Sequence, residues 1–291
     1  MPLCLRGSAI LVLLTALVWL QGGSGSEPVA FLDQPDSLQM PFPAGERLRY
    51  DIYWKPPKIL QWIIGDVVAG EVLIQVQESE YQGRETLTIH AKATTKGFVR
   101  RRFLEVDDEF ESVIDRTDFR TYRFKKVIRE GKKSRKDILV KFDYDQHQVE
   151  VEKIDLRKDP PQRDTKVFQG IAGPITDVLS VFYVARLREL SPGQRYRIQL
   201  ADEKKPEEVV VEVLRREKIK TRLDVFESVR ISTVGGFFNQ GGNFLIWYST
   251  NSHRFPVRFQ ADAKIGKVYG ELVGIDSGRT SRGVIRLGKK K

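Results

Sequence analysis

The chain contains a single cysteine, Cys4, among 291 residues, and only three histidines. One cysteine cannot form a disulfide within the chain or supply a thiolate metal site. His90, His147 and His253 are far apart in the sequence, and none has a second ligand at the spacing of a metal motif. We therefore expect no bound metal, no cofactor and a fold that is stabilised by packing alone.

A hydrophobic run long enough to span a membrane is missing as well. The apolar run SAILVLLTALVWL after Arg6 has about a dozen residues, fewer than the roughly 20 that a spanning helix needs. Followed by QGGSGS, it predicts a secretory signal peptide in residues 1–26, cleaved after Ser26, with an uncleaved anchor as the alternative. Cys4 precedes the run, which argues against lipidation. We expect an exported, periplasmic protein, and association with the membrane surface is left open.

Sequence motifs of common catalytic sites are also absent. No G-x-S-x-G pentapeptide occurs, and no Lys-Ser or Lys-Thr pair follows GGFFNQGG at 235–242, as a phosphate loop would require. Asp107, Glu109 and Glu111 would share one face of a strand. They fit either a hydrolase of cell-wall glycan or a solvated acidic face paired with basic residues of the next strand. We favour the second interpretation and expect no enzymatic activity and no catalytic residue.

The sequence is rich in alternating apolar and polar residues. In GERLRYDIYW, Leu48, Tyr50 and Ile52 alternate with polar neighbours, as in a half-buried strand. Short turn sequences separate the runs, which favours an antiparallel meander, and residues 155–167 are expected to form a crossover. Strands are predicted at 45–54, 66–77, 86–94, 103–113, 119–128, 136–144, 147–153, 194–200, 207–214, 218–222, 225–232, 243–249, 255–262 and 267–274.

The stretch PITDVLSVFYVARLREL at 174–190 departs from this alternation. Pro174 and Asp177 suit the start of a helix, and Ser191-Pro192-Gly193 suits its end. The helix would be apolar most of the way round, so we expect it to be enclosed by protein. A buried strand is the alternative, because VFYV favours β structure. The predicted fold is all-β and mainly antiparallel, a curved sheet or open, clam-like barrel around this one central α-helix.

This pattern predicts a single β-rich domain over residues 45–275. Its two sheet halves, 45–156 and 193–275, would be joined by the helix. The remaining mature segments are expected to be an extended N-terminal arm, 27–44, and a basic flexible tail, 276–291.

Positive charge exceeds negative charge by ten over the whole chain. The densest region is 116–136, where ten Lys or Arg residues stand against two acids. Such a surface favours anionic lipid or polysaccharide, and the export signal disfavours nucleic acid. The competing interpretation is a solvated hairpin whose lysines protect a sheet edge. The side chains predicted to contact an anionic headgroup are Arg123, Lys125, Lys126, Lys132 and Lys133.

Two apolar loops are candidates for the mouth of a ligand cavity. One is KPPKILQWIIG, whose two prolines disfavour a regular strand and which contains Trp62. The other is GGFFNQGG, which fits either a wide hairpin tip or an aromatic loop that contacts lipid or closes a cavity. We predict that Trp62, Phe237 and Phe238 contact the ligand.

Four stretches form an ordered pattern along the chain: FPAGERLRYDIYW (42–54), EVDDEFESVID (105–115), DVLSVFYVARLREL (177–190) before SPGQ, and LIWYSTNSHRFPVRFQ (245–260) before GKVYGEL. In order and spacing they resemble the exported bacterial family catalogued as domain of unknown function 3108. The resemblance implies an envelope-located, β-rich protein with a barrel-like or clam-like sheet, and it carries over no catalytic residue.

The function predicted from these features is that of an exported, non-enzymatic cell-envelope protein that binds a lipid-like or anionic glycan ligand. The alternative is a structural or assembly factor whose partner is another envelope protein. A hydrolase of cell-wall glycan is the third hypothesis.

Overall fold

The protein is known from a computed structural model, which describes residues 30–31, 40, 42–234, 244–263 and 266–278. The predicted signal peptide and most of the predicted N-terminal arm and basic tail therefore lie outside the described residues. The described strands form one sixteen-stranded sheet, and nearly all neighbouring strands are antiparallel. The exceptions are β1 (Ala30–Phe31) and β10 (Thr176–Asp177), which each pair in parallel with β11 (Arg195–Ala201).

Two groups of consecutive strands make up the sheet. The first group is β2 (Arg47–Lys55), β3 (Val67–Tyr81), β4 (Arg84–Thr95), β5 (Asp107–Asp115), β6 (Thr121–Glu130), β7 (Ser134–Asp143), β8 (Gln148–Asp155) and β9 (Gln162–Gln169). The second group is β11, β12 (Glu207–Lys220), β13 (Val225–Val234), β14 (Phe244–Ser249), β15 (Pro256–Ala263) and β16 (Gly266–Asp276).

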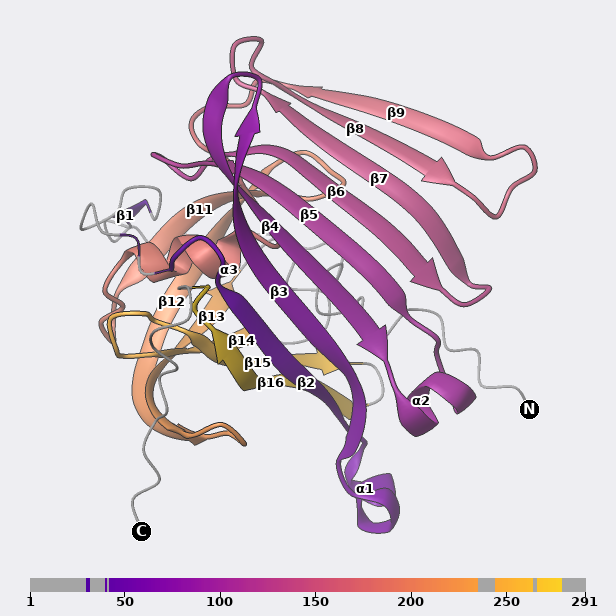
Figure 1. Cartoon of the computed structure of the whole chain (residues 1–291), viewed down its shortest axis with the longest axis vertical. Coiled ribbons are helices and arrows are strands. Elements are labelled where there is room, and N and C mark those ends of the chain that lie inside the picture. Colours follow the sequence, from indigo (N-terminus) through magenta and orange to yellow (C-terminus); the bar gives the residue numbers. More distant parts are fainter. Residues whose placement is uncertain (1–29, 32–39, 41, 235–243, 264–265, 279–291) are drawn as a thin grey trace.

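The two groups are continuous because the last strand of the chain pairs with the first long one. β16 lies antiparallel to β2, with Leu272 opposite Tyr50. The strand order therefore runs from β11 to β16 and then from β2 to β9, and the two ends of the sheet do not pair with each other. In Figure 1, β2–β9 form a broad twisted layer and β11–β16 curve beside it. The expected all-β, mainly antiparallel fold with an open, curved sheet is confirmed.

Three local features differ from the sequence prediction. The expected crossover contains an edge strand, β9, whose side chains are exposed on both faces and so show no alternation. The apolar loop KPPKILQWIIG contains a short helix, α1 (Lys58–Ile64). A second short helix, α2 (Gly97–Arg102), lies in the basic stretch KGFVRRRF after β4. The two strands expected at 207–214 and 218–222 are one strand, β12, with an irregular register between Val213 and Arg215.

The predicted helix over 174–190 is wrong in extent. Only α3 (Val181–Val184) and a 3-10 turn, η2 (Ala185–Leu187), are helical, and the preceding Thr176–Asp177 pair is extended as β10. The Asp177 carboxylate accepts the backbone N–H groups of Leu179 and Ser180 at 2.8 and 2.9 Å. These local hydrogen bonds compete with helix formation, and the helix begins only at Val181. The expected burial of the segment is observed.

The buried segment contacts both strand groups. Asp177 accepts hydrogen bonds from the hydroxyls of Ser112 and Thr121 in the first group, the latter at 2.8 Å. Phe182 packs edge-on against Phe244 and Phe259 of the second group, with ring centroids 6.0 Å apart in both cases. One stretch of chain therefore fills the space between the inner faces of both groups.

A buried ion pair fixes the C-terminal end of this segment. The Arg186 guanidinium donates to both carboxylate oxygens of Glu46, at 2.6 and 2.8 Å, and both side chains are almost fully buried. It also lies within 5.0 to 5.4 Å of the ring centres of Phe42, Tyr183 and Phe255. The pair connects the segment to the residues immediately before β2.

A buried carboxyl group lies on the inner face of β5. Asp108 is 1% exposed, and its Oδ1 accepts the backbone N–H of Arg129 at 2.7 Å. Burial raises the pKa of Asp108 from 3.8 to about 7, against the lowering effect of that hydrogen bond. The folded protein therefore holds a proton there at a pH at which the unfolded chain has released it.

The Arg186→Met variant is expected to lose about 3–5 kcal/mol of unfolding free energy, because it leaves the Glu46 carboxylate buried without its cation. Urea denaturation followed by circular dichroism measures this loss. The double variant Arg186→Met, Glu46→Gln should lose less than the single variant, since no unpaired charge remains. A single variant as stable as the wild type would contradict the assigned role.

The Asp108→Asn variant is expected to gain stability relative to the wild type as the pH rises. The contribution of protonated Asp108 is complete below the unfolded pKa of 3.8 and is lost as the pH rises through about 7. Because asparagine does not ionise, the difference in unfolding free energy should grow by about 3–4 kcal/mol between pH 4 and pH 8. Urea denaturation at several pH values measures it, and a difference independent of pH would refute the account.

Candidate functional site

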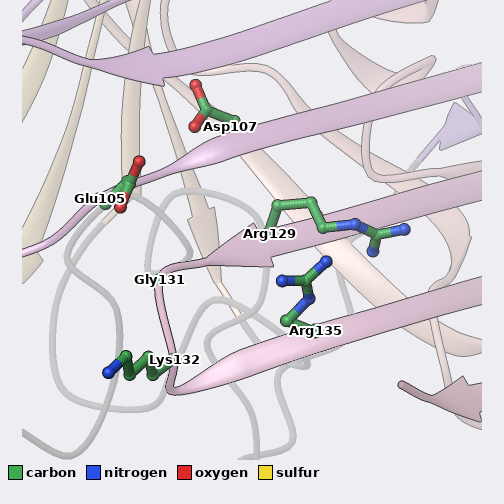
Figure 2. Close-up of a pocket in the computed structure, with 6 residues that line it drawn as sticks. All are labelled: Glu105, Asp107, Arg129, Gly131, Lys132 and Arg135. Atoms are coloured by element: carbon green, nitrogen blue, oxygen red, sulfur yellow. The ribbon is translucent and has the colours of Figure 1, made fainter. Parts of the chain in front are cut away.

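A cavity lies at one end of the sheet, where β5 begins and the β6–β7 hairpin turns. Its volume is about 440 Å³. Gly131 begins the turn with φ +53°, a conformation that glycine adopts without strain. Figure 2 shows the lining, which consists of Glu105, Asp107, Arg129, Gly131, Lys132 and Arg135. We call these residues the hairpin pocket.

Two arginines of the hairpin pocket face each other across neighbouring strands. Arg129 of β6 is the register partner of Arg135 of β7, and their side chains lie next to each other in Figure 2. Asp137 neutralises Arg129 at 2.7 Å. Like charges directly opposite each other destabilise a strand pair. An anion held between the two arginines would relieve this repulsion.

The remaining cations of the pocket have no carboxylate partner among the described residues. Lys132 and Arg135 are both exposed, and neither forms an ion pair within that part of the chain. The two acids of the pocket in contrast share one cation. Arg100 of α2 binds Glu105 at 2.6 Å and Asp107 at 2.8 Å. The free positive charge of the pocket therefore lies on the hairpin side.

This combination of groups defines what the pocket can bind. Lys132 and Arg135 can donate to a phosphate or carboxylate, and the planar guanidinium of Arg135 can do so with two parallel hydrogen bonds. The carboxylates of Glu105 and Asp107 can accept hydrogen bonds from hydroxyl groups. The lining is thus complementary to an anion that also carries hydroxyls.

A second cavity, of about 260 Å³, lies at the opposite end of the sheet, around the β3–β4 and β7–β8 turns. Two of its three cations are paired with carboxylates, and the third, Arg84, lies 5.7 Å from the ring centre of Tyr122. Arg120 pairs with Asp118 and lies 4.8 Å from the ring centre of Tyr144. Lys141 is 3.4 Å from Glu150. This cavity therefore offers less free charge to a ligand than the hairpin pocket does.

Lys126 was predicted to lie on the basic surface, and this prediction is wrong. Lys126 is fully buried on the inner face of β6, where its ammonium group contacts Asp202 at 2.5 Å and Glu203 at 2.6 Å. Burial alone would lower the pKa of Lys126, but the two carboxylates outweigh burial and raise it. Adjacent residues of a strand point to opposite faces, so Lys125 and Lys126 cannot share a surface.

The other predicted ligand contacts are dispersed. Lys132 is in the hairpin pocket, and Lys133 is exposed beside it in the same turn. Arg123 and Lys125 lie further along β6, and Arg123 pairs with Glu111 at 2.5 Å. Trp62 is exposed on α1. Phe237 and Phe238 lie outside the described residues.

Arg129 and Arg135 were not selected from the sequence, although both lie within the basic run 116–136. The useful signal was the glycine between them: it marks a hairpin turn, and a hairpin places residues on either side of the turn opposite each other. Charge counting alone does not show which cations share a face.

The outward row of acids on β5 pairs with basic residues of its surroundings. Glu109 lies 2.7 Å from Lys92 of β4, and Glu111 pairs with Arg123 of β6. Within the described ranges, no three His, Cys, Asp or Glu side chains group as potential metal ligands. Nor does any described helix have the length and apolar character needed to cross a bilayer.

Comparison with solved structures gives two distant similarities. A beta-barrel-like protein of domain of unknown function DUF1849 from Brucella abortus is 12% identical, with a TM-score of 0.49. A Bacteroides fragilis protein with a YmcC-like fold, whose name suggests export, is 11% identical with a TM-score of 0.31. Each alignment covers 81% of this chain and 98% of the other. No curated protein matches the chain.

The family comparison covers most of the chain. The model described as Protein of unknown function (DUF3108) matches residues 49–273, which include most of the described sheet. The resemblance seen in the sequence is thereby confirmed, and the chain belongs to the DUF3108 family.

Proposed function

We propose that the protein is an exported, non-enzymatic cell-envelope protein that binds a hydroxylated anion in the hairpin pocket. The ligand class comprises phosphorylated lipid headgroups and anionic glycans, which share a charged group surrounded by hydroxyls. The observation that carries the proposal is the opposed pair Arg129 and Arg135, with Lys132 at the turn between them.

Location and chemistry support this function independently. The apolar run and small residues in 1–26 support export to an envelope, where anionic lipids and glycans are abundant. The pairing of Asp107, Glu109 and Glu111 with basic side chains supports a binding role over glycan hydrolysis. A hydrolytic carboxyl pair needs one acid that is held protonated and free to donate to the leaving group.

The Lys132→Glu, Arg135→Glu double variant is expected to bind an anion at least about tenfold more weakly than the wild type, because it removes two charge-assisted hydrogen bonds. Isothermal titration with glycerol 3-phosphate and with a uronic-acid oligosaccharide measures the affinity and separates the two ligand sources. Glycerol and a neutral glucose oligosaccharide test whether the anionic group is needed.

A matched control is Arg216→Glu, Lys220→Glu, which reverses two exposed cations on β12 of the other strand group. This variant should keep wild-type affinity. If the pocket variant and the control bind equally, or if neither anion binds the wild type, the proposed site is wrong.

A second candidate function is an assembly factor for another envelope protein. It is favoured by β9, which ends the strand order and pairs only with β8 among the described strands. An open edge can accept a strand from a partner through backbone hydrogen bonds.

This alternative predicts that a photo-crosslinker at Val167 of β9, which is 50% exposed, traps one defined envelope protein in living cells. The same crosslinker at Val225 of β13, which is 54% exposed, should trap none. Mass spectrometry of the crosslinked band identifies the partner. Equal products, or no product, at both positions would argue against strand addition at β9.

A further inference from the structure

Exposed apolar side chains gather at the end of the sheet that carries the hairpin pocket. Trp62 and Ile59 of α1 are 95% and 84% exposed, and Phe98 and Phe103 at α2 are each more than 40% exposed. With Val68, these are five of the eight large apolar side chains that are exposed within the described ranges. Such a concentration marks an interaction surface, whereas scattered single residues do not.

The two helices that carry these side chains flank the start of one strand. α1 immediately precedes β3, and the residue before α2, Lys96, donates its backbone N–H to Ala69 of β3 at 2.8 Å. Phe103, just after α2, packs against Trp54 at the end of β2, with ring centroids 5.7 Å apart. Figure 1 shows α1 and α2 projecting from the same end of the sheet.

The position of α1 is fixed although its tryptophan is exposed. Asp66, just after the helix, accepts a hydrogen bond from Gln61 and another from the hydroxyl of Tyr269, both at 3.1 Å. Tyr269 in turn stacks on Tyr53 with ring centroids 4.9 Å apart. These contacts fix the C-terminal end of α1, and Trp62 is exposed in this position.

Unpaired cations surround the apolar side chains. Lys55, Lys58, Arg101 and Arg102 are exposed, and within the described part of the chain none of them contacts a carboxylate. Tryptophan prefers the interface between lipid and water, and basic residues beside it are attracted to anionic headgroups. An apolar surface on a protein partner would not require these four cations without carboxylate partners.

We propose that α1 and α2 form a docking surface for a bilayer that contains anionic phospholipid, with Trp62 and Ile59 in the interface and Arg101 and Arg102 at the headgroups. The surface adjoins the hairpin pocket, because Arg100 of α2 binds Glu105 and Asp107 of that pocket. This docking proposal rests on the proposed function in one respect: it takes the membrane as the place where the protein meets its anionic ligand.

Trp62 provides a specific signal for a test on the full chain. Subtracting the emission of the Trp62→Phe variant from that of the wild type removes the contribution of the other three tryptophans and isolates the exposed ring. With phosphatidylglycerol vesicles, we expect this difference spectrum to shift to shorter wavelength and to be quenched by brominated acyl chains. Pure phosphatidylcholine vesicles should produce little change.

Charge reversal tests the electrostatic part. The Arg101→Glu, Arg102→Glu variant should need at least about tenfold more anionic lipid for half of the shift. The Arg216→Glu, Lys220→Glu control should need the wild-type amount. A Trp62 signal that anionic vesicles leave unchanged, or equal lipid requirements for both variants, would overturn the proposal. Titration of the pocket with soluble glycerol 3-phosphate uses no vesicles, so the docking surface and the proposed function can fail separately.

Discussion

An open, curved sheet exposes an apolar inner face unless another part of the chain covers it, and here the segment around α3 does so. Its side chains meet β5 and β6 through Asp177 and meet β14 and β15 through Phe182. Burying each large apolar side chain contributes roughly 1.5–3 kcal/mol. The Arg186–Glu46 pair then fixes the segment to the start of β2, so the two strand groups share one core.

Because the inner face is filled by this segment, the described cavities lie at the two ends of the sheet. One end carries the second cavity, whose arginines and lysine are stacked on rings or paired with acids. The other end carries α1, α2 and the β6–β7 turn, where Trp62 is exposed and several cations have no carboxylate partner among the described residues. This asymmetry indicates that ligand and membrane binding belong to the end with α1, α2 and the hairpin pocket, whereas the charged groups of the other end mainly stabilise the fold.

The alternation of apolar and polar residues was sufficient to predict most of the strands, their antiparallel order and the burial of the middle segment, but it missed β9, which is exposed on both faces. It overestimated the helix because the parallel pairing of Thr176–Asp177 with β11 is a tertiary contact that periodicity does not reveal. The Asp177 carboxylate also accepts the backbone N–H groups of Leu179 and Ser180, which competes locally with helix formation. The residues of the candidate site could be predicted only in part from the sequence. The density of positive charge was sufficient to select Lys132. Arg129 and Arg135 lie opposite each other only because of the hairpin register, which charge counting does not show. Lys126 is buried because adjacent residues of a strand point to opposite faces.

The most direct test that ligand and membrane binding share one end of the sheet is hydrogen exchange of the full chain, measured by mass spectrometry with and without phosphatidylglycerol vesicles. The account predicts slower exchange in residues 58–64, 97–105 and 129–135, which contain α1, α2 and the hairpin pocket. Slowing confined to the opposite end, in the turns at 82–83 and 116–120, would contradict it. Unchanged exchange at both ends would contradict it equally.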